Sequence, residues 1–143
     1  VTDFTPDMLA ALHAASFDTP RPWSATEFAG LLSMKGVFLT TGAGPSFALG
    51  RYVPDEVELL TIAVSPEARG HGLGRAILRR YEAEAQNRGA TQSFLEVAAN
   101  NTPAISLYLS EGYSESGHRK AYYSAPNGTK IDARMFTKRI NQT

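Results

Sequence analysis

The chain has 143 residues, which is enough to bury one hydrophobic core. Its 14 basic residues balance its 14 acidic residues, so no net charge would attract it to nucleic acid or to an anionic membrane. It contains no cysteine, which excludes disulfides, thiolate metal sites and a cysteine nucleophile.

Two helices are predicted before the first strand. Residues 5–15 begin with Thr-Pro-Asp, which can cap and start a helix, and Pro20 and Pro22 end it. Residues 24–32 begin with a serine followed three positions later by a glutamate, which has the form of a capping box. We therefore expect two short helices in this part of the chain.

Three strands follow these helices. Residues 37–40 and 47–53 flank the turn Gly-Ala-Gly-Pro at 42–45, a pattern that predicts a hairpin. After a second turn, the mostly apolar residues 57–64 form the third predicted strand.

The remaining elements complete a mixed α/β fold. Apolar residues at helical spacing predict a helix over 72–88, and residues 92–97 form the next strand. With the strand before the helix they make a βαβ unit, which is expected to be parallel and right-handed. A helix starting with Thr-Pro is predicted over 102–111, and residues 113–123 and 130–138 form a closing hairpin.

Nothing in the sequence divides the chain, so we expect a single domain over residues 1–143. No apolar run approaches the roughly 18–20 residues that a membrane-spanning helix needs. Residues 1–4 lack the basic and then apolar profile of a secretory signal. These features predict a cytoplasmic protein that binds neither a membrane nor nucleic acid.

A glycine-rich turn lies between the third strand and the long helix. Residues 69–75 read Arg-Gly-His-Gly-Leu-Gly-Arg, and its three glycines let the backbone approach a ligand closely. The first amides of a helix are unpaired and lie at the positive end of its dipole, which favours phosphate. Arg69 and Arg75 add positive charge. The turn predicts a phosphate or pyrophosphate site, although a flexible turn without a ligand has the same appearance.

Two other phosphate motifs differ from this turn in spacing. A Walker A loop ends in Gly-Lys-Ser/Thr, whereas Arg-Ala follows the last glycine here. A dinucleotide fingerprint needs Gly-x-Gly-x-x-Gly, whereas Gly70, Gly72 and Gly74 alternate. Glu96, 22 residues after Gly74, partly matches the acidic residue that this fingerprint places about 20 residues on. The spacing disfavours a dinucleotide site without eliminating it.

The turn and the strand before it resemble the Arg/Gln-x-x-Gly-x-Gly/Ala signature of the GNAT superfamily of N-acetyltransferases. The resemblance implies a mixed central sheet of about six or seven strands with about four helices. Its central parallel strands would splay apart to admit the pantetheine arm of acetyl-CoA, the cosubstrate. The residues implied to bind the pyrophosphate are Gly70, His71, Gly72, Leu73, Gly74 and Arg75, and those implied to pair with the pantetheine arm are Ile62, Ala63 and Val64.

The resemblance extends to the RimI-type ribosomal-protein alanine N-acetyltransferases and covers residues 22 to 136. The matching segments are Pro22-Trp23-Ser24, Leu95-Glu96-Val97, Asn100-Asn101, Ala104-Ile105, Leu107-Tyr108, Glu111-Gly112-Tyr113 and Tyr122-Tyr123. This branch implies that an acetyl group moves from acetyl-CoA to the N-terminal α-amine of a protein, directly in a ternary complex. A ribosomal protein is the preferred acceptor.

The chemistry of that transfer needs a base and an acid. The attacking amine must lose a proton and the leaving thiolate must gain one. By resemblance, Glu96 is the general base and Tyr108 the general acid. Without the resemblance, Glu96 could point to solvent from its strand, and Tyr108 could be a core residue of its helix.

Other candidate residues have weaker assignments. Asn101 resembles an asparagine that reaches the pantetheine or pyrophosphate; its alternative role is capping the next helix, for which Thr102 is better placed. Tyr122 and Tyr123 could wall the acceptor site, but adjacent strand residues face opposite ways, so at most one should do so. Trp23 fits either the acceptor channel or a structural anchor. The three histidines have no metal-ligand spacing, and no metal site is predicted.

Two departures leave the acceptor open. Ala98 stands where RimI-type proteins often have arginine, and Ile131 stands where an acidic residue is common. The rival acceptors are a small-molecule amine and a lysine side chain. A rival from another class is a non-catalytic acyl-CoA binding module, which would bind the ligand without turnover.

Overall fold

The computed structural model describes residues 4–16 and 23–140, and the predicted ends of the first helix, Pro20 and Pro22, lie outside these ranges. Four α-helices and six strands are present in the described residues. The helices are α1 (Pro6–Ser16), α2 (Ala25–Leu32), α3 (Leu73–Asn87) and α4 (Thr102–Ser110), with a short 3-10 turn, η1 (Pro66–Ala68). The strands are β1 (Val37–Thr40), β2 (Ser46–Val53), β3 (Glu56–Val64), β4 (Gln92–Ala98), β5 (Ser114–Ser124) and β6 (Lys130–Arg139).

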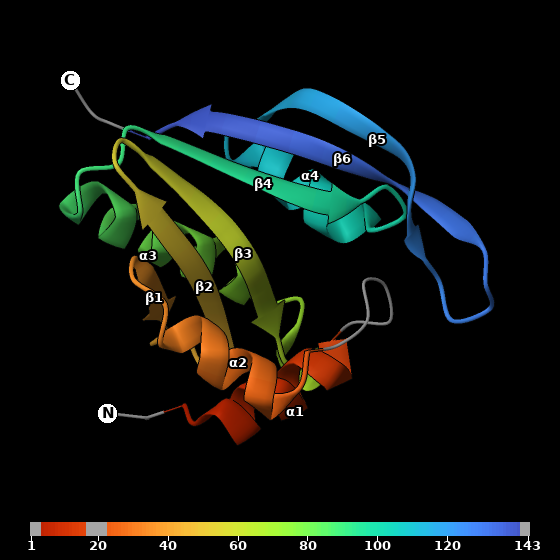
Figure 1. Cartoon of the computed structure of the whole chain (residues 1–143), viewed down its shortest axis with the longest axis horizontal. Coiled ribbons are helices and arrows are strands. Elements are labelled where there is room, and N and C mark those ends of the chain that lie inside the picture. Colours follow the sequence, from red (N-terminus) through yellow and green to blue (C-terminus); the bar gives the residue numbers. More distant parts are fainter. Residues whose placement is uncertain (1–3, 17–22, 141–143) are drawn as a thin grey trace.

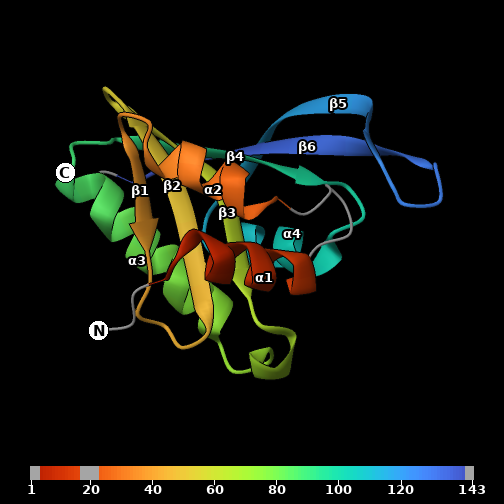
Figure 2. The same cartoon turned by 60° about the horizontal axis from the view of Figure 1, so that its bottom comes forward.

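The strands form one sheet in the order β1-β2-β3-β4-β6-β5. Only β3 and β4 pair in parallel; the other neighbours are antiparallel. The helices α1 and α2 cross one face of the sheet, and α3 and α4 lie behind it (Figures 1 and 2). The predicted mixed α/β architecture is therefore confirmed.

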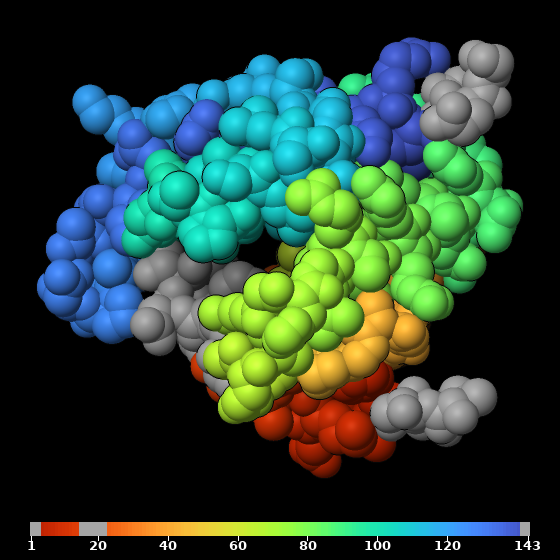
Figure 3. Space-filling model, turned by 180° about the vertical axis from the view of Figure 1, so that it is seen from behind, coloured from red at the N-terminus to blue at the C-terminus, as the bar shows by residue number. Residues whose placement is uncertain are grey.

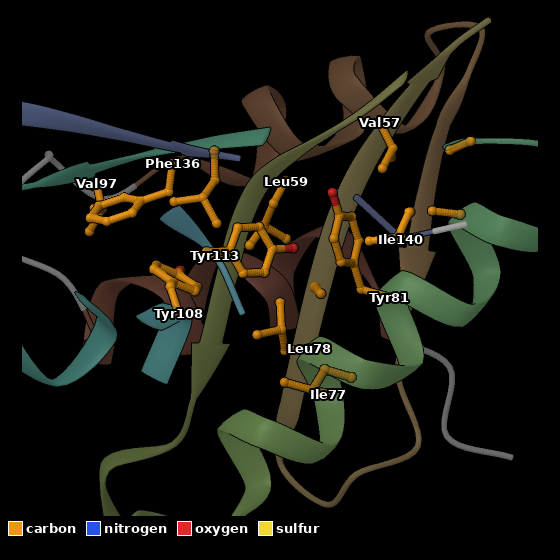
Figure 4. Close-up of a cluster of buried hydrophobic side chains, with 14 of the residues drawn as sticks. Val57, Leu59, Ile77, Leu78, Tyr81, Val97, Tyr108, Tyr113, Phe136 and Ile140 are labelled. Atoms are coloured by element: carbon orange, nitrogen blue, oxygen red, sulfur yellow. The ribbon is translucent and has the colours of Figure 1, made fainter. Parts of the chain in front are cut away.

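Each face of the sheet has its own apolar cluster. The larger cluster joins α3 and α4 to the sheet and includes Ile77, Tyr81 and Phe136 (Figure 4). Within it, Ser93 is fully buried and its hydroxyl lies 2.9 Å from the hydroxyls of both Tyr81 and Tyr113. Apolar burial at roughly 25 cal/mol per Å² is the main force that holds these layers together. The smaller cluster packs α1 and α2 against β2 and β3.

The two parallel strands separate toward their carboxyl ends. They pair only from Glu56 and Gln92 to Leu59 and Leu95. Beyond that point β4 continues to pair with β6, whereas β3 continues with β2 after a bulge in their register. Figure 1 shows the resulting V between β3 and β4. The splay predicted from the family resemblance is present, and it opens a space between two strands that would otherwise be closed by hydrogen bonds.

Two helix starts test the capping predictions. The capping box of α2 is confirmed: the Glu27 amide donates to Ser24 Oγ (3.1 Å), and the Ser24 amide donates to Glu27 Oε1 (2.9 Å). The prediction that Thr102 caps α4 is wrong. Asn101 is the cap, and its Oδ1 accepts from the Ala104 amide at 3.3 Å, because the helix starts one residue before Pro103.

Across the described ranges, the helices are too short or too polar to cross a membrane.

Candidate active site

Two cavities meet where β3 and β4 separate. We call the first, of about 310 Å³, the turn cavity, because the glycine-rich turn after β3 forms one wall and α4 forms the other. The second, of about 330 Å³, is the tyrosine cavity, which lies between β3, β4 and the end of β5. Ile62, Asn101, Ala104 and Tyr108 line both. Figure 3 shows the hollow between the lime-green segment after β3 and the teal α4.

The glycine-rich turn presents backbone to the turn cavity. Gly70 and Gly72 have φ of +84° and +77°, a conformation that side chains disfavour, and no described atom lies within 4 Å of a Cβ placed on either. Gly72 precedes α3 and has no side chain that could cap it, so the first amides of α3 remain for a ligand. Arg69 also lines this cavity, and its Nε donates to the Val64 carbonyl at 3.2 Å. The lining fits an anionic group that approaches the backbone closely.

Most of the residues predicted to bind the coenzyme lie on this lining. They are Ile62, Ala63, Val64, Gly70, Gly72, Leu73, Gly74 and Asn101. His71 is exposed, and neither it nor Arg75 belongs to the lining formed by the described residues. The Arg75 guanidinium instead contacts Glu111 and donates to Ser110 Oγ at 3.0 Å, so its charge is directed away from the turn.

The tyrosine cavity holds Glu96. Its neighbours Leu95 and Val97 are buried in the larger cluster, so Glu96 points from the opposite face of β4 into the cavity rather than freely into solvent. Its Oε2 lies 3.3 Å from Arg119 Nε, which is within ion-pair distance, but accepts no hydrogen bond from the described residues. This oxygen therefore remains available for a proton.

Tyr108 lies at the junction of the two cavities. It is 4% exposed, and its ring packs beside those of Tyr113 and Phe136, at centroid distances of 5.8 and 6.5 Å (Figure 4). Burial raises the pKa of the Tyr108 hydroxyl, so the residue stays protonated at neutral pH. The arrangement brings one carboxylate and one neutral phenol to the same space, from β4 and α4.

Comparison with known proteins agrees with this geometry. The profile of the acetyltransferase (GNAT) family matches residues 36–113. The chain is 37% identical to the [ribosomal protein bS18]-alanine N-acetyltransferase of Escherichia coli over 127 residues, which cover 87% of this chain and 86% of that protein. It is also 37% identical over 123 residues to the N-alpha-acetyltransferase RimI of Mycobacterium tuberculosis, covering 80% and 75%.

The chain belongs to the GNAT acetyltransferase family, in its RimI-type branch. The crystal structure of the Escherichia coli ribosomal-protein-S18-alanine N-acetyltransferase superposes with a TM-score of 0.85 at 31% identity, covering 100% of this chain and 92% of that one. This GNAT enzyme is therefore an acetyl-CoA-dependent N-acetyltransferase, and a non-catalytic binding module is not its function.

One carboxylate of the acetyltransferase site had no role in the sequence-based prediction. Glu58, on β3, lines the tyrosine cavity with Glu96. Burial, and to a lesser degree the charge of Glu96, raise the pKa of Glu58, while its ion pair with Arg51 at 3.2 Å opposes that shift. A charged side chain within an otherwise apolar strand was the signal in the sequence that pointed to it.

His13 was also missed as part of this wall. It is 2% exposed and stacks on Trp23 at a centroid distance of 5.0 Å, with both rings lining the tyrosine cavity. Its Nδ1 accepts from the Trp23 amide at 3.1 Å, which leaves Nε2–H to donate to Thr61 Oγ1, also at 3.1 Å. Burial lowers the pKa of His13 to about 4, so the ring is neutral. His13 lies 45 residues before Glu58 in the sequence, so no local pattern indicated that it would line the same cavity.

The two tyrosines of the closing hairpin contradict the prediction that at most one could wall the acceptor site. Both Tyr122 and Tyr123 line the tyrosine cavity, with ring centroids 5.2 Å apart. The register of β5 and β6 shifts between Arg119 and Tyr123, so the alternation of a regular strand does not apply there.

Within residues 4–16 and 23–140, no group of three His, Cys, Asp or Glu side chains could hold a metal ion.

Proposed function

We propose that this GNAT enzyme acetylates the N-terminal α-amine of a protein, with acetyl-CoA in the turn cavity and the amine in the tyrosine cavity. The observation that carries the proposal is the meeting of the two cavities at Tyr108, which lines the tyrosine cavity together with Glu96. A thioester and an amine that enter from opposite sides would meet there, which supports direct transfer in a ternary complex.

Binding of acetyl-CoA would depend mainly on backbone. The amides at the start of α3 and the positive-φ glycines Gly70 and Gly72 suit its pyrophosphate. The end of β3, from Ile62 to Val64, no longer pairs with β4, so its edge is open to the amide groups of the pantetheine arm. Asn101 lines this path, with Oδ1 engaged in capping α4 and its amide nitrogen left as a donor.

The proposed transfer moves two protons. The amine nitrogen attacks the thioester carbonyl carbon and gives up a proton to the Glu96 carboxylate, directly or through water. The carbon–sulfur bond breaks, and the coenzyme thiolate takes the phenolic proton of Tyr108. The role of Tyr108 as the acid rests on its place at the junction of the two cavities, because the raised pKa keeps the phenol protonated but also makes it a weaker proton donor. An α-amine with a pKa of about 7.7–8.0 needs only a modest base such as a carboxylate.

The acceptor is proposed from the relatives. The Escherichia coli protein, at 37% identity, is named for acetylating an alanine of ribosomal protein bS18. We infer the same class of acceptor here, a protein N-terminus beginning with alanine. The alternative acceptor is a small-molecule amine or a lysine side chain. This alternative is favoured by Ala98, a residue of the cavity wall at a position where RimI-type proteins often have arginine.

An acceptor panel tests this proposal. The full chain is incubated with acetyl-CoA and, separately, with alanine-initial peptides, the same peptides blocked at the N-terminus but containing lysine, and small polyamines. Thiol release is measured for each. We expect the free alanine-initial peptides to have the highest kcat/KM, by roughly 100-fold over the blocked peptides. A preference for polyamines or for the blocked lysine peptides would contradict the proposed acceptor.

A further inference from the structure

The wall of the tyrosine cavity contains a strained bulge in β5. Arg119 pairs with Ala133 and Tyr123 with Ile131, so three residues of β5, from 120 to 122, face the single residue Asp132 of β6. At the centre of this bulge Ala121 has φ of +54°, a left-handed conformation that a residue with a Cβ disfavours. Such a conformation persists only where neighbouring groups stabilise it.

The Asp132 carboxylate holds this bulge with both of its oxygens. Oδ1 accepts from the Ala121 amide at 2.7 Å, and Oδ2 lies 2.7 Å from His118 Nε2. The first bond fixes the residue at positive φ, and the second ties the strand just before the bulge. These two contacts join the centre of the bulge to the residue that precedes it in the strand.

The bulge decides which side chains reach the cavity. In a regular strand Tyr122 and Tyr123 would point to opposite faces of the sheet. Here both line the cavity, at an interplanar angle of 74°. Arg119, at the start of the bulge, lies over the Tyr122 ring at 5.1 Å and reaches toward Glu96. Tyr122 and Tyr123 therefore form one outer wall, whose shape follows from the conformation at Ala121.

We propose that Asp132 is a positioning residue for the acceptor: by holding Ala121 at positive φ it sets the wall formed by Tyr122 and Tyr123, and so determines how tightly a peptide acceptor binds. It touches neither cavity lining nor reacting atom itself. The inference deepens the proposed function and rests on it, because it takes the tyrosine cavity as the acceptor site.

Steady-state kinetics with acetyl-CoA and one alanine-initial peptide test the proposal. Asp132→Ala should raise the KM of the peptide about five- to tenfold, the effect of losing a hydrogen bond to a charged group. The kcat and the KM of acetyl-CoA should change by less than about twofold, because the turn cavity lies on the other side of Tyr108. Asp132→Asn keeps an oxygen for the Ala121 amide and should remain close to the unchanged protein.

A second substitution separates positioning from general destabilisation. Glycine adopts positive φ without penalty, so adding Ala121→Gly to Asp132→Ala should restore the peptide KM to within about threefold of its original value. Glu84→Ala is the control: it removes a partly exposed carboxylate and its ion pair with Arg88 at the end of α3, away from this hairpin, and should leave the kinetics unchanged. Equal rises in the KM of the peptide and in the KM of acetyl-CoA for Asp132→Ala would overturn the proposal. A peptide KM that Ala121→Gly fails to restore would overturn it as well.

Hydrogen exchange at the Ala121 amide gives a readout that does not depend on turnover. This amide should exchange slowly in the unchanged protein and in Asp132→Asn, and at least about tenfold faster in Asp132→Ala. If the unchanged protein fails to acetylate the peptide, the proposed function is wrong. If exchange at Ala121 is the same with and without Asp132, the role of Asp132 alone is wrong.

Discussion

The turn cavity and the tyrosine cavity are neighbours, but they are built in different ways. The turn cavity takes its lining from two short stretches of the chain, residues 62–74 and 101–108, and includes the three glycines of one turn. The tyrosine cavity collects side chains from α1, β3, β4, α4 and β5 and from Trp23, which span residues 13 to 123. A site made of local backbone is visible in a sequence as a motif. A site made of distant side chains becomes visible only once the chain is folded.

The same contrast extends to chemistry. The turn offers unpaired amides, which bind any phosphate that fits and do not select the acceptor. The tyrosine cavity holds two carboxylates, a neutral histidine and three tyrosines, which can select an amine and remove its proton. Changes to the two cavities should therefore affect different kinetic constants.

The largest expected effect is on the chemical step. Glu96→Gln removes the proposed base and should lower kcat by about 100-fold or more, with the KM of acetyl-CoA unchanged. Glu58→Gln is the matched substitution in the same cavity. Because the Glu58 carboxylate already accepts a hydrogen bond from Arg51 at 3.2 Å, we expect it to lower kcat by less than about tenfold.

Stopped-flow measurement of thiol release with saturating substrates would distinguish these two carboxylates. A greater loss of kcat in Glu58→Gln than in Glu96→Gln would transfer the role of base from β4 to β3. Equal losses would indicate that the two carboxylates act together.

An intermediate effect is expected on the KM of acetyl-CoA. Gly72→Val adds a side chain to the open side of the turn at φ +77°, and should raise the KM of acetyl-CoA roughly tenfold or more while the KM of the peptide stays the same. Gly128→Val is the control, because Gly128 has φ +85° and open space around it but lies in the β5–β6 turn. If both variants bind acetyl-CoA equally well in a titration, the glycine-rich turn is not the pyrophosphate site.

A separate effect, on stability and not on turnover, is expected through the wall of the tyrosine cavity. The pKa of His13 is about 4 in the folded protein, against an ordinary value of 6.5, so the unfolded chain binds more protons between these two values. His13 therefore contributes no penalty above pH 6.5, and stability falls as the pH drops toward 4, by no more than about 3 kcal/mol. Urea denaturation from pH 7 to 4 should show this slope, and His13→Gln should reduce it. An unchanged slope in the variant would assign the pH dependence to other groups.

The sequence alone determined the order of elements and the cosubstrate side of the site. Hydrophobic periodicity located the helices and strands, because the burial of one face imposes a repeat on the residues themselves. The glycines at 70, 72 and 74 predicted a phosphate site, since a residue without a side chain allows close approach to the backbone, and in the fold all three line the turn cavity. Glu96 and Tyr108 were found by family resemblance, and the fold brings both to one cavity.

Tertiary structure decided the tyrosine cavity, the proposed acceptor side. Nothing local in the sequence indicates that His13 reaches Thr61, or that Glu58 and Glu96 share a cavity. The rule of alternating strand residues failed at Tyr122 and Tyr123, because the register with the next strand shifts there, where Asp132 accepts a hydrogen bond from the Ala121 amide. Local propensity acts through neighbours in the chain, whereas the acceptor wall depends on contacts between residues that only folding brings together.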